Sequence, residues 1–229
     1  MHFSLITPAA GSERDAAHEW AGSAYTEHQW IWRFLPAAVG TARSFLFRRR
    51  DVDGLPRFYV VSEHEPVAPS PHWQVVSKRY TPQLSPGDPL AFELRANPVI
   101  TVRSANGKAA RHDVVMQEKT RLLKDRRLMR WADWQTPDRP PLQDLVQRTC
   151  SQWLLARCQR LGITINDDTL SVEGYEQHRG KNGELRFSTV DFSGSLRVVN
   201  ADALRVALFG GIGHAKAFGC GLMLVRRVG

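Results

Sequence analysis

Cysteine is scarce in this sequence. The chain has three cysteines among 229 residues, Cys150, Cys158 and Cys220, and none of them forms a Cys-x-x-Cys pair. Since an odd number of cysteines is a poor disulfide framework, we expect the protein in a reducing compartment. The eight histidines show neither a His-Glu-x-x-His motif nor His/Cys pairs with zinc spacing. The sequence therefore predicts no metal site and no cofactor.

Long hydrophobic runs are missing as well. No apolar stretch approaches the roughly 18 residues of a membrane span. The start, Met-His-Phe-Ser-Leu-Ile-Thr-Pro, lacks the basic segment of a secretory signal. Low-complexity tracts are absent too, and hydrophobic residues make up an ordinary 42% of the chain. We expect a globular protein of the cytoplasm.

Acidic residues are too few to balance the basic ones. The chain has 31 lysines and arginines against 23 aspartates and glutamates, which gives a net charge of +8. A positive excess is typical of proteins that bind polyanions, although it does not select one polyanion. Six cations crowd one segment with little acid nearby: Lys119, Arg121, Lys124, Arg126, Arg127 and Arg130. Such a run is usually a solvated face, and it matches no motif.

The order of the expected elements is nearly repeated along the chain. The first half predicts a strand at 2–6, a long helix from about 12 to 35, strands at 44–47 and 57–61 around a turn at 51–54, and a strand at 73–76. After a proline-rich boundary at 82–89, the second half predicts strand-like residues 90–102, a helix at 142–161, strands at 170–175 and 185–192, a helix at 201–209 and a strand at 222–228. We predict an α+β fold of two tandem ferredoxin-like (β-α-β-β-α-β) domains, residues 1–86 and 87–229.

A glycine-rich loop lies near the C-terminus, from Gly210 to Gly221. It holds five glycines and one lysine, Lys216, so its backbone N–H groups are able to form an anion site, with phosphate as the first candidate. The P-loop pattern fails because Ala215 and Ala217 flank the lysine, and a Rossmann triplet starting at Gly211 fails because Lys216 stands where its third glycine belongs. The alternative is a turn that packs a helix end against a strand.

Tyr25 and His28 stand three residues apart on the first predicted helix, so their side chains are neighbours on one face. Imidazole is the usual general acid or base, and a phenol can orient a reacting hydroxyl. Arg33 lies five positions after His28, roughly 140° around the helix. His28 also falls on the apolar stripe of this helix, and a buried structural histidine is the competing interpretation. The residues alone leave catalysis undecided.

Several stretches together resemble one known family. They are a short N-terminal strand, YTEHQWIWRFLP at 25–36, FELRANPV at 92–99 followed by Gly107-Lys108, and GIGHAKAFGCG at 211–221. In this order they resemble the CasE (Cse3) family, the CRISPR RNA-processing endoribonucleases of the type I-E Cascade complex, in the RAMP superfamily. The resemblance covers essentially the whole chain.

The resemblance implies two ferredoxin-like domains and a CRISPR repeat RNA stem-loop held across them. It implies metal-independent cleavage on the 3′ side of the stem by a ribose 2′-hydroxyl, which leaves a 2′,3′-cyclic phosphate and a 5′-hydroxyl. The processed RNA stays bound, and other Cascade subunits are expected partners. His28 would be the general base or acid, and Tyr25 would position the hydroxyl or the scissile phosphate.

The resemblance also implies the RNA contacts. A basic hairpin would grip the stem through Arg179, Lys181 and Arg186. The scissile strand would lie against the glycine loop at Gly211, Gly213, Lys216, Gly219 and Gly221, and Arg33 is a further expected contact. The hairpin is otherwise an ordinary exposed tip. The alternative function is a non-catalytic RNA-binding subunit, in which Tyr25 and His28 would be expendable, whereas the failed glycine patterns disfavour a nucleotide-phosphate enzyme.

Overall fold

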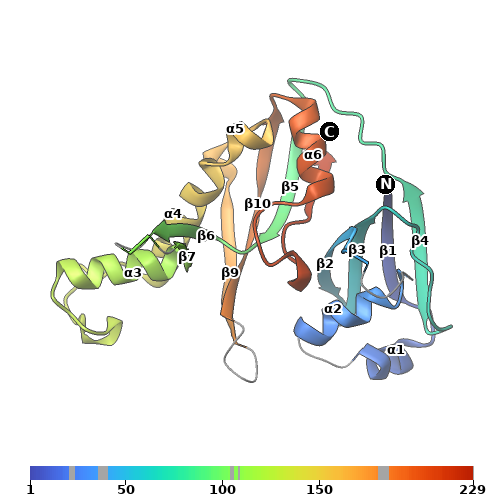
Figure 1. The fold of residues 1–229 in the computed structure, drawn as a ribbon, viewed down its shortest axis with the longest axis horizontal. Coiled ribbons are helices and arrows are strands. Elements are labelled where there is room, and N and C mark those ends of the chain that lie inside the picture. Colours follow the sequence, from blue (N-terminus) through green and yellow to red (C-terminus); the bar gives the residue numbers. More distant parts are fainter. Residues whose placement is uncertain (21–23, 36–40, 104–105, 108, 180–185, 229) are drawn as a thin grey trace. The chain divides into compact units, whose positions relative to one another are not determined.

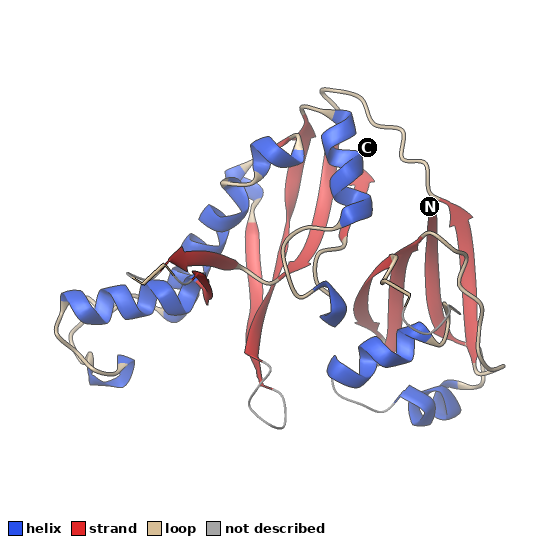
Figure 2. Cartoon of the chain, viewed as in Figure 1, coloured by secondary structure: helices blue, strands red, loops and turns tan. Residues whose placement is uncertain are grey.

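The structure is a computed structural model that describes residues 1–20, 24–35, 41–103, 106–107, 109–179 and 186–228. The chain forms two compact units. The first contains Met1–Leu84 with Arg205–Leu224, and the second contains Ser85–Leu204 with Val225–Gly229. Each unit is built on an antiparallel sheet with helices, drawn in red and blue in Figure 2, which confirms the predicted α+β class.

The sheet of the first unit has the order β2-β3-β1-β4. Its strands are β1 (His2–Pro8), β2 (Phe45–Val52), β3 (Leu55–Ser62) and β4 (Trp73–Arg79). The predicted hairpin between β2 and β3 is confirmed, because Asp53 and Gly54 form its two-residue turn with φ of 54° and 76°. Two successive positive φ values are what a tight turn between twisted strands requires. The order leaves β2 at one edge of the sheet.

Helices α1 (Glu13–Trp20) and α2 (Ala24–Trp32) lie within the stretch predicted as one helix, and residues 21–23 between them are outside the described part. Helix α2 lies across one face of the sheet (Figure 1). Trp30 packs its ring 4.7 Å from that of Phe58 and 4.5 Å from that of Trp73. Buried Ile31 and Phe34 belong to the same core cluster. The aromatic stripe of the sequence therefore fixes α2 on the sheet.

The first unit departs from the β-α-β-β-α-β pattern in its second helix. Residues 63–72, which join β3 to β4, form no helix. Pro66, Pro69 and Pro71 lie in this connection, and proline both removes an N–H donor and disfavours the helical conformation of the preceding residue. The other face of the sheet is covered instead by residues 205–224, since Leu222 and Phe209 pack with Leu46 and Val61. The glycine loop thus groups with the first unit, whereas the sequence placed it in the second domain.

The sheet of the second unit has the order β11-β5-β10-β8, with β9 also paired to β10. Its strands are β5 (Pro89–Ala96), β8 (Ile163–Ile165), β9 (Ser171–Arg179), β10 (Arg186–Val198) and β11 (Met223–Arg227). Helices α4 (Leu142–Leu155) and α5 (Cys158–Leu161) take the place of the single helix predicted at 142–161, and the turn η2 (Asp167–Thr169) follows β8. Helix α6 (Ala201–Gly210) and the turn η3 (Lys216–Phe218) lie between β10 and β11 in the chain, and their residues from Arg205 onward group with the first unit. Trp153 of α4 stacks on Phe192 of β10 at 5.9 Å, so the apolar stripe predicted for this helix faces the sheet.

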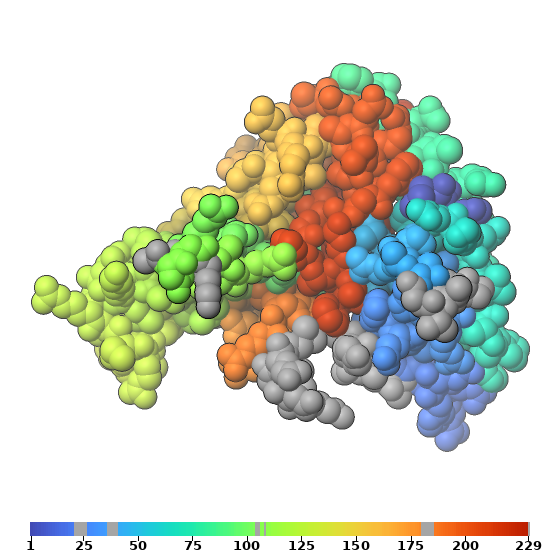
Figure 3. Space-filling view, in the orientation of Figure 1, coloured from blue at the N-terminus to red at the C-terminus, as the bar shows by residue number. Residues whose placement is uncertain are grey.

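An insertion lies between β5 and α4. It consists of the hairpin β6 (Val99–Arg103) and β7 (Ala109–Asp113), helix α3 (Val114–Asp125) and the turn η1 (Trp131–Asp133). Of these elements, only β6 overlaps the strand-like residues predicted at 90–102. Asp113 caps α3, because its carboxylate accepts a hydrogen bond from the Met116 amide at 2.7 Å. The space-filling view shows α3 and the loop after it, in yellow-green, projecting from the rest of the second unit (Figure 3).

In the folded chain, cations of the basic segment 119–130 pair with nearby carboxylates. Arg121 pairs with Glu118 at 2.7 Å and with Asp125 at 2.8 Å, and Arg130 pairs with Asp133 at 3.1 Å. Helical spacing of three and four residues brings these charges together, which the linear sequence does not display. The interpretation as a solvated face is therefore favoured. Among the described helices, none is long and apolar enough to cross a membrane.

Candidate active site

His28 lies on α2 with its ring against the edge strand. The imidazole stacks on Phe45 at 6.3 Å with an interplanar angle of 23°, and it is half-buried. Its Nε2 atom accepts a hydrogen bond from the indole Nε1 of Trp32 at 3.2 Å. Because an indole N–H only donates, this bond requires an unprotonated Nε2. The ring is therefore neutral, with its proton on Nδ1.

Two causes favour the neutral imidazole. Burial lowers the pKa of His28 below its ordinary value, and the charge of Arg43 lowers that pKa further. Desolvation penalises the charged form of a base, and a nearby like charge acts in the same direction. An imidazole that is neutral at physiological pH can accept a proton, which is what a general base needs.

The charge of Arg43 acts on both His28 and Lys216. Burial lowers the pKa of Lys216, and the charge of Arg43 lowers it as well. Helix α2 contacts η3, which begins at Lys216, and the Lys216 ammonium donates a hydrogen bond to the carbonyl of Gly210. The structure thus associates His28 and Lys216, which the sequence singled out separately, with Arg43, which it missed. Arg43 lies in no motif, so only the long-range packing reveals it.

The glycine loop is seated on the edge strand β2. A Cβ atom added to Gly211 would lie 2.8 Å from a methyl of Leu46, and one added to Gly219 would lie 3.3 Å from the ring of Phe47. Successive strand residues point to opposite faces, so the loop reaches both sides of β2. Both glycines have φ of +74°, which other residues rarely adopt. This packing explains the glycines and places Lys216 near α2. Contacts of Gly211, Gly213, Gly219 and Gly221 with RNA remain predictions.

Gly221 provides a test of this packing. Gly221→Ala should lower the free energy of unfolding by about 1–3 kcal/mol, a typical cost of forced backbone strain. The reason is that its φ is +91° and an added Cβ would lie 2.9 Å from the carbonyl oxygen of Ile212. Gly210→Ala is the matched control, since Gly210 has open space around its Cβ position and no positive φ. Denaturant unfolding of both variants measures the difference, and equal stabilities would contradict the packing role.

The structure places Tyr25 on α2 three residues before His28, but its side chain lies outside the described part. Arg33 follows the end of α2, and its side chain is exposed. The backbone N–H of Arg33 donates to the carbonyl of Trp30 at 3.0 Å, so the chain leaves the helix at this point. The roles of Tyr25 and Arg33 remain predictions.

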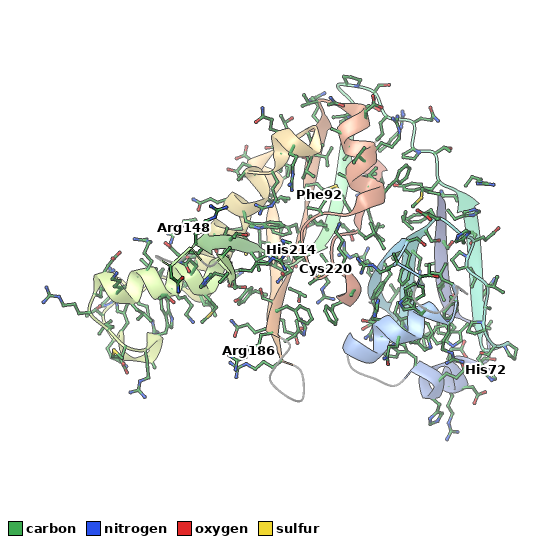
Figure 4. The ribbon with its side chains drawn as sticks, in the orientation of Figure 1. His72, Phe92, Arg148, Arg186, His214 and Cys220 are labelled. Atoms are coloured by element: carbon green, nitrogen blue, oxygen red, sulfur yellow. The ribbon has the colours of Figure 1, made fainter. Side chains whose placement is uncertain are left out.

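In the second unit, the basic hairpin brings Arg179 and Arg186 directly opposite each other in the β9–β10 ladder. Both side chains are exposed, and Figure 4 shows Arg186 at the end of β10. Neither arginine has an ion-pair partner among the residues that the structure describes. Lys181 lies among residues 180–185, outside the described part. Like charges directly opposite in a sheet are destabilising, and a bound anion would relieve this repulsion.

An aromatic pair lies beside these arginines. His178 and Phe187 are opposite each other on the next rung of the ladder, and their rings stack at 4.7 Å. The His178 Nε2 atom also lies 2.9 Å from the hydroxyl of Thr189. The pair holds the end of the hairpin in register. Sequence reasoning missed it, although alternation along two paired strands would have placed both rings on one face.

Comparison with known proteins shows the family of this chain. A family model described as CRISPR associated protein matches residues 1–227. The chain belongs to this CRISPR-associated family. It is also 27% identical over 210 residues to the CRISPR system Cascade subunit CasE of Escherichia coli K12, covering 90% of this chain and 94% of that protein. The predicted resemblance to the CasE family is confirmed.

Solved structures share the fold. The CRISPR endoribonuclease Cse3 bound to a 19-nucleotide RNA has a TM-score of 0.66 at 23% identity, covering 99% of this chain and 100% of that one. The CRISPR-associated protein Cas6e of Escherichia coli K-12 has a TM-score of 0.60 at 24% identity, with both chains covered completely. These likenesses support the predicted tandem ferredoxin-like fold.

Proposed function

We propose that this protein is an endoribonuclease that binds the stem-loop of CRISPR repeat RNA, cleaves it on the 3′ side of the stem without a metal ion and retains the product. The family supports this function, since one relative is a Cascade subunit and one structural neighbour is a CRISPR endoribonuclease bound to RNA. The observation that carries the proposal is His28, a neutral imidazole whose pKa the charge of Arg43 lowers, on a helix that contacts the turn beginning at Lys216. A base next to cations suits a reaction at a phosphate.

The residues suggest a division of the chemistry. His28 accepts the proton of the ribose 2′-hydroxyl at Nε2, where that hydroxyl takes the place of the Trp32 indole as donor. The 2′-oxygen attacks the adjacent phosphorus and the bond to the 5′-oxygen breaks, giving the 2′,3′-cyclic phosphate. The leaving oxygen takes up a proton and becomes the 5′-hydroxyl. Because the nucleophile is part of the substrate, the site has to supply proton transfer and charge neutralisation. Tyr25 would position the hydroxyl or the phosphate.

Stem binding is assigned to the hairpin of the second unit. Regular A-form RNA has a major groove too narrow for side chains, so Arg179 and Arg186 would mainly grip phosphates. Arg33 and the glycine loop would contact the cleaved strand. Other Cascade subunits are proposed partners, and the cytoplasm is the proposed location.

The direct experiment uses the purified full chain and its own repeat RNA in EDTA. We expect a single cut on the 3′ side of the stem, a 2′,3′-cyclic phosphate on the upstream product and continued binding of that product. Tight binding without any cleavage would instead establish the non-catalytic RNA-binding subunit.

The arginine pair yields a prediction about affinity. The double variant Arg179→Ala, Arg186→Ala should bind the stem-loop more weakly, and the slope of log K against log salt should become shallower by up to about 2, nearly one unit for each lost phosphate contact. Binding isotherms at several salt concentrations measure both effects. The cleavage rate at saturating protein should not change, because proton transfer is assigned to His28.

A matched control removes the same charge elsewhere. Arg121→Ala with Arg130→Ala also deletes two exposed cations, but these already pair with carboxylates. This double variant should leave the salt slope nearly unaltered. An equal effect from both double variants would mean that only net charge matters. A loss of affinity with the wild-type salt slope would mean that Arg179 and Arg186 read bases or support the hairpin.

A further inference from the structure

Arg43 is a half-buried cation without a full set of partners. It lies two residues before the start of β2 and its Nη1 atom is buried. No group among the described residues accepts a hydrogen bond from that atom. Burial lowers the pKa of the Arg43 guanidinium, which reflects the cost of removing its charge from water. A buried donor on a charged group is expensive to leave unpaired. An anion that binds there would offset this cost.

The surroundings of Arg43 define which anion fits. Phe45, two residues after Arg43, carries the ring on which His28 stacks. Helix α2 contacts η3, where Lys216 begins the turn. The charge of Arg43 lowers the pKa of both His28 and Lys216. Three basic groups on three different segments of the first unit therefore share one electrostatic environment.

The acid nearest to His28 in the sequence lies close to a different cation. The nearest acid on α2 is Glu27, adjacent to His28 in sequence, and it lies 3.9 Å from Arg49 of β2. Among the causes that shift the pKa of His28, Arg43 and Lys216 in the described part, no acidic group occurs. Arg43 and Lys216 are like charges that act on each other, and no described carboxylate is among the causes that shift their pKa values. Such an arrangement is costly for stability and useful for binding an anion.

We propose that the guanidinium of Arg43 binds a non-bridging oxygen of the scissile phosphate beside His28. This inference rests on the proposed function and names the residue that neutralises the phosphate in the reaction. When the 2′-oxygen attacks, the phosphorus carries five oxygens and its equatorial oxygens gain negative charge. A planar guanidinium can donate two parallel hydrogen bonds to such oxygens. A donor that is already in place stabilises the charge as it develops.

Arg43 has a second effect, on proton transfer. Its positive charge disfavours the imidazolium, so the wild-type His28 stays neutral to a lower pH. Removing the charge should raise the pKa of His28. Burial, the other cause that lowers this pKa, remains in the variant. A residue with a merely structural role would leave both the imidazole titration and phosphate binding unaltered.

The test compares Arg43→Ala, Arg43→Lys and the control Arg14→Ala, which removes an exposed cation from α1 in the same unit. Arg43→Ala should lower the single-turnover rate by about 10²-fold or more, the usual cost of losing one charge-stabilising donor. Arg43→Lys should restore part of the rate, since it keeps the charge but loses the bidentate geometry. Arg14→Ala should cleave as the wild type does. Affinity for RNA with a 2′-deoxy ribose at the cut should change far less than the rate.

A readout without cleavage separates this inference from the proposed function. The ring protons of His28 are followed by NMR as pH is varied, and again as inorganic phosphate is added. Arg43→Ala should raise the pKa of His28 and weaken its response to phosphate. If the wild type fails to cut its repeat RNA, the proposed function fails, yet this titration still decides whether Arg43 binds phosphate beside His28.

Clear results would overturn the inference. A rate for Arg43→Ala within about threefold of wild type, or an unaltered His28 titration and phosphate response, would each reject it. Should Arg43→Ala not fold, as seen by thermal unfolding, Arg43→Gln takes its place, because it keeps hydrogen-bond donors and most of the volume but lacks the charge.

Discussion

We expect His28→Ala to lower the single-turnover cleavage rate by about 10²-fold or more, which is the usual contribution of a general acid–base group. The wild-type imidazole is neutral and half-buried, and its Nε2 atom accepts a hydrogen bond from Trp32 that a substrate hydroxyl could replace. Affinity for the stem-loop should barely change, because stem binding is assigned to Arg179 and Arg186. Rapid-mixing cleavage assays and binding isotherms on the same RNA measure the two effects separately.

The pH dependence follows from the same residue. A general base acts in its deprotonated form, so the wild-type rate should rise with pH and level off above an apparent pKa that lies below the ordinary imidazole value of about 6.5. The sign follows from burial and Arg43, both of which lower the pKa of His28. His18→Ala, at an exposed histidine of α1, is the control and should retain the wild-type rate and profile. Near-normal cleavage by His28→Ala would return His28 to a structural role.

The second large effect concerns the substrate. Replacing the ribose immediately 5′ to the scissile phosphate with its 2′-deoxy form should abolish cleavage, since the attacking oxygen is then absent. Binding should be retained, because the phosphates and the stem are unchanged. A 2′-deoxy sugar one nucleotide further upstream serves as the control and should be cleaved.

Chelation tests whether cleavage needs a metal ion. Cleavage of the all-ribose RNA should persist in EDTA at its usual rate. Loss of activity on chelation, or cleavage of the 2′-deoxy substrate, would indicate a metal-activated water as the nucleophile. The product ends discriminate further, since a hydrolytic water does not produce a 2′,3′-cyclic phosphate.

Helix α2 and the edge strand β2 of the first unit hold His28 at the border of the core. Trp30 and Phe34 fasten α2 to the sheet through Phe58 and Trp73. With these aromatic anchors in place, His28 rests on Phe45 of β2 rather than in the middle of the core. A half-buried position lowers the pKa of the ring while it still admits a substrate group. The catalytic role of His28 and the competing structural role both remain predictions, which the cleavage rate of His28→Ala decides.

Local features of the sequence determined much of this protein. Alternating and helical periodicities depend on neighbours in the chain, so they predicted the hairpin β2–β3, strand β10 and helices α4 and α6. Spacing of three residues also selected Tyr25 and His28. The hydrogen bond between Trp32 and His28 could have been predicted in the same way, because residues four apart are neighbours on a helix. We did not predict it.

Tertiary structure alone decided the rest. Arg43 and Lys216 are far apart in the chain, and no periodicity connects them. The glycine loop was expected in the second domain because it follows α6, yet Leu46 and Phe47 of β2 provide the surface on which it packs. Long-range packing depends on the shapes of surfaces that form only after the sheet does. The charge environment of His28 arises in the same way, since distance in space sets the interaction of charges and the sequence does not contain that distance.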